Sequence, residues 1–384
     1  MRRRSSILSV VLILFASACL DRIDIDTGFI PLNSIIINGS ITNEPGPYQV
    51  AISLGFDIES KESFRNPVSA RSVVISDDNG TSEKLKETSP GIYVTEPDGI
   101  SGTVGRTYVL RVELRDGRVY ESVPETLLES GRIDSLYSEF TEEKTPDDVS
   151  VYGFDVKYIP SIISENSYYL MWKFTGTFQS DTNPELKIDE PCGAITCQGC
   201  NFCNYKPLCS GLRNVSQLPG IDRAIFVRIG PCECCTCWYD FFNPQILLSD
   251  DQFVQQGKFS AQTAMHIPLD AWIFQHRVYA KVTQFTLSRN AFEFWKSVKD
   301  QKTAINSLFQ PVTGKIKTNF VQVSGTPVGV DGLFFASGVA SKAMFIDRED
   351  VKSSVPIPEP GIPFGESCLK LFPYSTDQKP EFWE

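Results

Sequence analysis

Short apolar runs separated by turn residues are the feature that most constrains the fold of this chain. Residues 48–54 and 108–114 alternate apolar with polar or small side chains, the period of a half-buried β-strand. The sequences Asp-Asp-Asn-Gly at 77–80 and Asp-Gly at 116–117 are hairpin turn signals between such runs. A helical period does not fit this alternation. The pattern predicts an antiparallel β-sandwich of immunoglobulin or transthyretin type over residues 34–127.

A second, larger domain is expected because the 384 residues exceed the usual size of one domain. Further strand-like runs continue to residue 346. We therefore predict a larger β domain over residues 132–352, with a cysteine-rich insert at 179–237 and a proline-rich C-terminal tail at 353–384. The expected fold class is mostly β, with two antiparallel β-sandwich-like domains.

One helix is predicted in the second domain, over residues 289–302. Ala291, Phe294, Trp295 and Val298 have the i, i+3, i+4, i+7 spacing of a single apolar stripe. Asn290 followed by Glu293 is similar to a capping box. We expect the stripe to pack against the sheet; a groove for a partner is the alternative.

The N-terminus has the pattern of a secretory signal peptide over residues 1–18. Arginines at 2–4 precede an uncharged apolar run at 5–15, and small residues precede Cys19. Small residues directly before a cysteine resemble the lipobox of bacterial lipoproteins, in which that cysteine is lipidated. We expect a lipid on Cys19 and a tether over 19–33; the alternative is an ordinary secreted protein with Cys19 as a spare thiol.

The residues behind Cys19 carry further targeting information. Asp21, Asp24 and Asp26 resemble the surface-export signal of Bacteroidota lipoproteins, although a solvated tether gives the same composition. No later segment has the roughly 18 consecutive apolar residues of a transmembrane helix. The lipid is therefore the expected attachment to the membrane.

The charge of the chain excludes one class of partner. The formal charge is −11, and loss of three arginines with the signal peptide makes it more negative. Nucleic-acid binding depends on Lys and Arg that neutralise phosphates, so no nucleic-acid partner is expected.

Ten cysteines besides Cys19 form an even set, which in an exported chain predicts disulfides of open connectivity. Adjacent Cys234 and Cys235 are expected to pair with other cysteines. The alternative is a zinc or iron–sulfur site, because the spacings within 197–203 and 232–237 suit metal ligands. A mixture of zinc and disulfides, or a redox-active pair, is also left open; we expect no cofactor and no metal. The ten are Cys192, Cys197, Cys200, Cys203, Cys209, Cys232, Cys234, Cys235, Cys237 and Cys368.

Enzymatic activity is not expected from the sequence. His266 and His276 are the two histidines, and neither lies in a Gly-x-Ser-x-Gly or His-Glu-x-x-His motif. No phosphate-binding glycine motif occurs. Glycoside hydrolysis needs two carboxylates close together in space, and one sequence does not show which of the many acidic residues lie close to each other. No catalytic residue is therefore assigned.

A family resemblance extends over nearly the whole mature chain. It is carried by Gly-Ser-Ile-Thr-Asn-Glu-Pro-Gly-Pro-Tyr at 39–48, Tyr-Leu-Met-Trp-Lys-Phe at 169–174, Cys-Thr-Cys-Trp at 235–238, Ala-Phe-Glu-Phe-Trp at 291–295 and Gly-Leu-Phe-Phe-Ala-Ser at 332–337. Together these segments resemble the domain-of-unknown-function family 4249 of Bacteroidota lipoproteins. The resemblance implies an outer-membrane location and TonB-dependent receptors as partners, but no catalytic residues.

The expected function is that of a non-enzymatic lipoprotein of the outer membrane, facing the cell exterior. It would assist a TonB-dependent transporter by capturing a small-molecule, peptide or glycan ligand or by capping the barrel. A structural subunit of a larger outer-membrane complex is the first alternative. A metal- or redox-linked role of residues 192–237 is the second. A ligand-sized cavity would favour capture over scaffolding.

Overall fold

The structure is a computed structural model of the chain. It describes residues 34–55, 66–161, 169–186, 209–215, 225–249, 254–255, 258–305, 316–352, 354–357, 367–372 and 374–383. The predicted signal peptide, the tether with Cys19, and Cys192, Cys197, Cys200 and Cys203 lie outside the described residues. The described chain is mostly β-strand, which confirms the predicted mostly β class. The expectation of purely antiparallel sheets is wrong at one place, where residues 35–42 and 330–337 pair in parallel.

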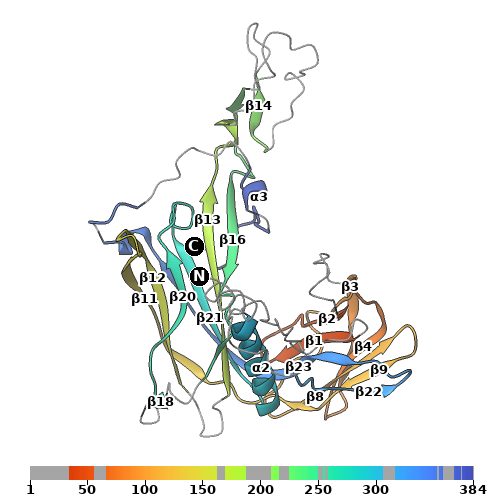
Figure 1. The fold of residues 1–384 in the computed structure, drawn as a ribbon. Helices are drawn as coiled ribbons and strands as arrows, with labels where there is room; N and C mark the ends of the chain where they lie inside the picture. The colour runs from red at the N-terminus through yellow and green to blue at the C-terminus, as the bar shows by residue number, and fades with distance from the viewer. Residues whose placement is uncertain are drawn as a thin grey trace, which may run out of the picture.

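The first sandwich is formed by two facing sheets (Figure 1). One contains β1 (Ile35–Thr42), β2 (Gln49–Leu54), β3 (Asn66–Pro67), β6 (Lys86–Ser89) and β7 (Ile92–Val94). The other contains β4 (Ala70–Asp77), β5 (Ser82–Lys84), β8 (Thr107–Leu114), β9 (Val119–Ser122), β10 (Glu125–Thr126) and β22 (Phe320–Ser324). The alternation read from the sequence places Val50, Ile52, Leu110 and Val112 in the shared core.

Strand β23 (Val330–Ile346) joins the two halves of the molecule. Its first half pairs in parallel with β1, and its second half pairs antiparallel with β21 (Val278–Thr286). One ten-stranded sheet therefore runs through both sandwiches. The first core includes Phe320 and Phe334, so the sandwich expected from residues 34–127 also contains β22 and the first half of β23. The parallel pairing of β23 with β1 adds this distant part of the chain to the first sandwich.

The second sandwich packs the other end of the long sheet against a three-stranded sheet. Besides β21 and β23, the long sheet here contains β13 (Leu170–Asp181), β16 (Thr236–Phe242) and β17 (Leu247–Leu248). The smaller sheet contains β11 (Arg132–Lys144), β12 (Ser150–Ser161) and β20 (Gln262–Pro268). Trp172 is buried between them, and its indole Nε1 donates to Gln284 Oε1 at 2.8 Å. A separate short hairpin consists of β18 (Val254–Gln255) and β19 (Lys258–Phe259).

Helix α2 (Arg289–Ile305) follows β21 directly and confirms the predicted helix at 289–302. Its expected cap is wrong. The backbone N–H of Ala291 donates to Ser288 Oγ at 3.2 Å, so Ser288 caps the helix. Glu293 accepts from Arg289 Nε at 2.9 Å, one turn away, instead of bonding back to Asn290. The helix thus begins two residues earlier than a cap at Asn290 implies.

Two cross-linked segments extend the second sandwich. The hairpin of β14 (Leu212–Asn214) and β15 (Phe226–Arg228) projects from it as an arm (Figure 1). Near the C-terminus, α3 (Cys368–Leu371) is held to β16 by the Cys237–Cys368 disulfide. Trp383 is buried, and its Nε1 donates to Gln179 Oε1 at 3.1 Å. The last residues of the predicted tail therefore pack on the second sandwich. Two 3-10 turns complete the described elements, η2 (Pro184–Leu186) and η5 (Arg348–Asp350).

Candidate ligand pocket

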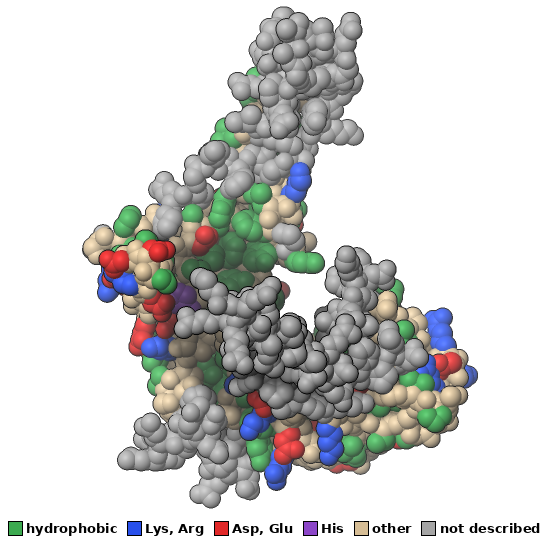
Figure 2. Space-filling view, in the orientation of Figure 1, with side chains coloured by type: hydrophobic (Ala, Val, Ile, Leu, Met, Phe, Trp, Pro, Cys, Tyr) green, Lys and Arg blue, Asp and Glu red, His purple; other side chains and the backbone are tan. Residues whose placement is uncertain are grey.

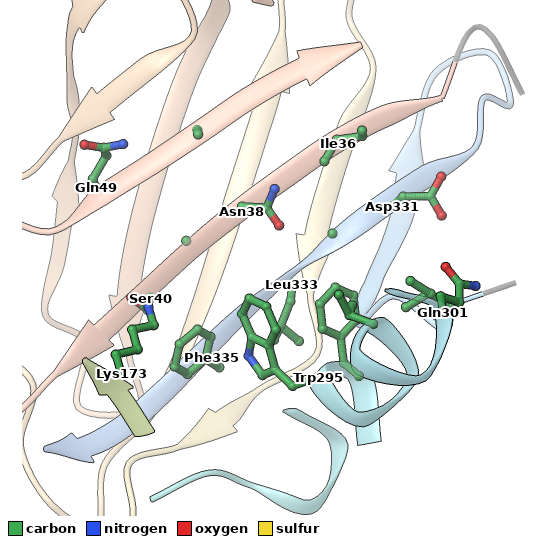
Figure 3. Close-up of a pocket in the computed structure, with 16 residues that line it drawn as sticks. Ile36, Asn38, Ser40, Gln49, Lys173, Trp295, Gln301, Asp331, Leu333 and Phe335 are labelled. Atoms are coloured by element: carbon green, nitrogen blue, oxygen red, sulfur yellow. The ribbon is translucent and has the colours of Figure 1, made fainter. Parts of the chain in front are cut away.

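A pocket of about 510 Å³ lies between α2 and the outward face of the first sandwich (Figure 3). Its floor is made by β1, β2 and the first half of β23, and one wall by α2. Lys173, on β13, reaches the pocket from the second sandwich. The pocket therefore forms where the two halves of the chain meet, the kind of place in which ligand sites commonly occur.

The floor follows from strand alternation. On β1, Ile35, Ile37 and Ile41 enter the first core, so Ile36, Asn38 and Ser40 point to the opposite face and line the pocket. On β23, Val330, Phe334 and Ala336 enter the core, so Asp331, Leu333 and Phe335 line the pocket. Both faces of this part of β23 are covered, which explains its nearly continuous apolar sequence.

Gly332 allows the two floor strands to lie close together. Its φ is +101°, and a Cβ built there would lie 2.0 Å from the carbonyl oxygen of Ile37. An L-residue with a side chain would be strained in this backbone conformation and would also collide with β1. The glycine is thus required by the parallel pairing that forms the pocket floor.

The predicted apolar stripe of α2 forms the helical wall of the pocket. Ala291 packs in a small buried cluster with Leu333 and Phe335. Phe294 and Trp295 pack against this cluster, and both line the pocket together with Val298. The buried Nε1 of Trp295 has no hydrogen-bond acceptor in the described part of the chain. The stripe therefore both packs against the sheet, as predicted, and leaves a cavity beside it.

Lys173 supplies a positive charge to the pocket. Its Nζ lies 5.0 Å from the centre of the Phe285 ring, a cation–π distance. No carboxylate of the described residues lies within ion-pair distance of this ammonium group. The side chain remains accessible, yet surrounding protein atoms displace water from the ammonium, and this desolvation lowers the pKa of Lys173.

Asp331 supplies the opposite charge at the other end of the floor (Figure 3). It is almost completely buried on β23, four positions before Phe335. Four residues of strand span about 13 Å, so the pocket is elongated and differs in charge between its ends. Amide and hydroxyl groups of Asn38, Gln49 and Ser40 lie along the same floor.

The two histidines lie outside the lining of this pocket. His266 Nδ1 is 2.8 Å from Asp155 Oδ1, and His276 Nε2 is 2.7 Å from Asp181 Oδ2. Burial opposes ionisation of Asp181, but hydrogen bonds from His276 and Thr236 lower its pKa overall. The Thr236 hydroxyl donates to Asp181 and does not bond His276. Within the described residues each histidine forms a hydrogen-bonded pair with an aspartate of a neighbouring strand, and the absence of an enzymatic role stays a prediction.

Six of the ten candidate cysteines lie in the described residues, and all six form disulfides. The pairs are Cys209–Cys234, Cys232–Cys235 and Cys237–Cys368. Adjacent Cys234 and Cys235 pair outward, as expected. The sulfur atoms of Cys209, Cys232 and Cys235 lie within 4.8 Å of one another, close enough for a metal set. Each is consumed in a disulfide, so metal binding there would first require reduction.

Sequence reasoning missed this pocket. The stripe on α2 was visible, but its partner surface comes from β1 and β23, which are nearly three hundred residues apart in the chain. The polar outward face of β1, Asn38 and Ser40 beside Ile36, was the one local signal. A polar strand face is also common on any exposed sheet, so it does not identify a site.

The fold and pocket define a class: a β protein of two sandwiches that share one sheet, with a ligand-sized cavity where they meet. None of the helices in the described ranges is both long and apolar enough to cross a bilayer. The family model for the Domain of unknown function (DUF4249) matches residues 21–343, and the chain belongs to this family. The family resemblance of the sequence motifs is thereby confirmed. No curated protein matches the chain at a significant level.

Proposed function

We propose that this protein is a lipid-anchored lipoprotein of the outer-membrane surface that captures a small ligand for a TonB-dependent transporter. The observation that carries the capture role is the pocket between α2 and the shared sheet. Its volume of about 510 Å³ lies within the range of small-molecule sites, which are concave, mostly apolar and equipped with a few polar groups. A pure scaffold has no need of such a cavity.

The membrane location is supported by the sequence around Cys19. A diacylglycerol and an additional acyl chain on that cysteine would anchor the chain stably, since each buried CH₂ contributes about 0.8 kcal/mol. The tether of residues 19–33 would then place the first sandwich near the membrane surface. The transporter is proposed as partner by analogy, because of the family resemblance.

A scaffolding role is the second candidate, and the projecting arm favours it. The arm is cross-linked at its base by Cys209–Cys234 and exposes the apolar side chains of Val227 and Ile229. Figure 2 shows further hydrophobic side chains gathered on the second sandwich below the arm. Exposed apolar surface of this kind marks protein contacts. In this alternative the arm binds another subunit and the pocket is not used.

Co-purification from mildly solubilised outer membranes tests the proposal. The full-length lipidated protein is isolated by a C-terminal tag, beside a Cys19→Ala variant as the control for anchoring. We expect a large barrel protein in stoichiometric amount with the wild type and its loss with the Cys19→Ala variant. An assembly of several other proteins without a transporter would contradict the capture role and support scaffolding.

A further inference from the structure

We infer that the pocket selects ligands with an apolar body that ends in a carboxylate, and that Lys173 is the residue that recognises this group. The inference deepens the proposed capture function, because it names the class of ligand for the same pocket. It rests on three features of the lining: an ammonium group with no acidic partner among the described residues, an apolar middle, and an indole N–H with no acceptor in the same part of the chain.

The charge of the pocket points to a single negative group on the ligand. Lys173 is the one cationic side chain among the described lining residues. Its side chain is accessible to a ligand, but the ammonium is partly desolvated and has no counter-charge within the described residues, so an anionic group on a ligand would supply the missing counter-charge. A phosphate ester carries nearly two charges and is typically bound by several cations or by a helix N-terminus. One lysine in an apolar pocket therefore fits a carboxylate better.

The middle of the pocket points to an apolar body. Leu333 and Phe335 on the floor lie opposite the ring of Trp295 on the wall (Figure 3), and Val298 of α2 also lines the pocket. These surfaces extend over about 13 Å between the Asp331 end and the Phe335 end, which suits an elongated ligand. Apolar walls of this kind favour aliphatic or aromatic groups over the many hydroxyls of an unmodified sugar.

The indole of Trp295 points to an acceptor on the ligand. Its Nε1 is buried and has no acceptor within the described residues. Buried indole N–H groups usually have a partner, and one left without it costs free energy. A carbonyl or carboxylate oxygen of a bound ligand would supply that partner. Lys173 and Trp295 together then favour ligands that carry hydrogen-bond acceptors in addition to an apolar body.

Matched probes that differ only in charge test this inference. Binding of 5-phenylvalerate and 5-phenylvaleramide is measured by isothermal titration with the purified full chain. N-acetyl-leucyl-phenylalanine and its C-terminal amide provide the same comparison on a peptide. The two pairs distinguish a simple organic acid from a peptide C-terminus as the source of the carboxylate. We expect the acid to bind at least about tenfold more tightly than the amide in one pair or both, because charged hydrogen bonds are about twice as strong as neutral ones.

Four variants test whether the preference arises in the pocket. Lys173→Met should abolish the difference between acid and amide, and Lys173→Arg should retain most of it. Lys296→Met removes the same charge from the exposed side of α2 and should leave the difference unchanged. Ser40→Trp fills the pocket and should abolish binding of every probe.

The outcomes separate this inference from the proposed function. Equal binding of acid and amide, lost in Ser40→Trp, would overturn the carboxylate selectivity and leave ligand capture supported. A preference that survives Lys173→Met would overturn the role of Lys173. Absence of binding by all four probes at millimolar concentration would overturn the inference, while partnership with a transporter is decided separately by co-purification.

Discussion

Buried ionisable side chains show how single residues couple this fold to pH. Glu125 is 1% exposed on β10, and its Oε1 lies 3.5 Å from Asn319 Nδ2. The Asn319 side chain also donates through Nδ2 to the carbonyl oxygen of Phe334 on β23 and accepts at Oδ1 from the N–H of the same residue. Burial raises the pKa of Glu125, against the smaller opposing effect of hydrogen bonds from Ser288 and Asn319. This carboxyl group therefore lies at a junction of the first sandwich, β23 and the start of α2.

The raised pKa of Glu125 predicts a loss of stability at higher pH. A folded-state pKa above the unfolded value means that the folded state binds the proton more tightly. The resulting stabilisation is complete below pH 4.5, the ordinary value, and is lost as the pH rises through the folded-state pKa. Glu125→Gln should remove this loss and raise the melting temperature at pH 8 more than at pH 4. Glu143→Gln, exposed on β11, is the control; equal shifts at both pH values would contradict the prediction.

The lowered pKa of Lys173 predicts that ligand binding depends on pH in the alkaline range. Because desolvation lowers the pKa of Lys173, its ammonium should lose its proton at a lower pH than the ordinary 10.5. The affinity for 5-phenylvalerate should therefore decrease as the pH is raised toward 10, while the affinity for the amide stays constant. Titrations at pH 7, 8.5 and 10 measure this difference. A parallel decrease for acid and amide would indicate a general effect on the fold instead.

At the scale of elements, β23 is the strand on which both the fold and the pocket depend. Gly332→Ala should disrupt its pairing with β1, because the new Cβ has no space and the backbone has a positive φ. A non-glycine residue in such a conformation costs about 1–3 kcal/mol before the collision is counted. We expect destabilisation of at least about 2 kcal/mol in urea unfolding.

Gly329→Ala is the matched control for this strand. A Cβ at Gly329 would meet its nearest neighbour, Ser34 Cβ, at an ordinary 3.5 Å. Its effect should stay within about 0.5 kcal/mol, as for most surface changes. Similar destabilisation by both substitutions would show that the close approach at Gly332 does not limit the pairing.

The individual elements were predictable from the sequence, but their pairing was not. Alternation identified β2 and β8, and the apolar stripe identified α2, because these signals are local. The parallel pairing of Ile35 with Val330 joins residues that no local pattern connects. The same limit applies to the pocket: Trp295 was visible as a core residue, whereas the floor beneath it depends on that distant pairing.

At the scale of the whole molecule, disulfides and the packed C-terminal segment stabilise the second sandwich. Cys237–Cys368 links cysteines 131 residues apart, whereas Cys232–Cys235 links cysteines three apart. Longer loops lose more entropy on closure in the unfolded chain, so the long-range bridge should stabilise more. It also holds the segment that carries buried Trp383.

Paired substitutions test this ranking. Replacing Cys237 and Cys368 together by alanine should destabilise the protein by about 2–4 kcal/mol and expose residues 376–383 to hydrogen exchange. Replacing Cys232 and Cys235 together is the control and should cost less. A larger cost from the short-range pair would contradict the entropic argument and indicate that the arm contributes more to stability than its loop length implies.

Ligand capture in the pocket between α2 and the shared sheet is the central claim. Native mass spectrometry of the lipoprotein, released intact from its own outer membrane, tests it most directly. We predict an additional mass of one small molecule on the wild type that is absent from the Ser40→Trp variant. A wild-type protein without added mass, or a Ser40→Trp variant that retains it, would contradict the claim.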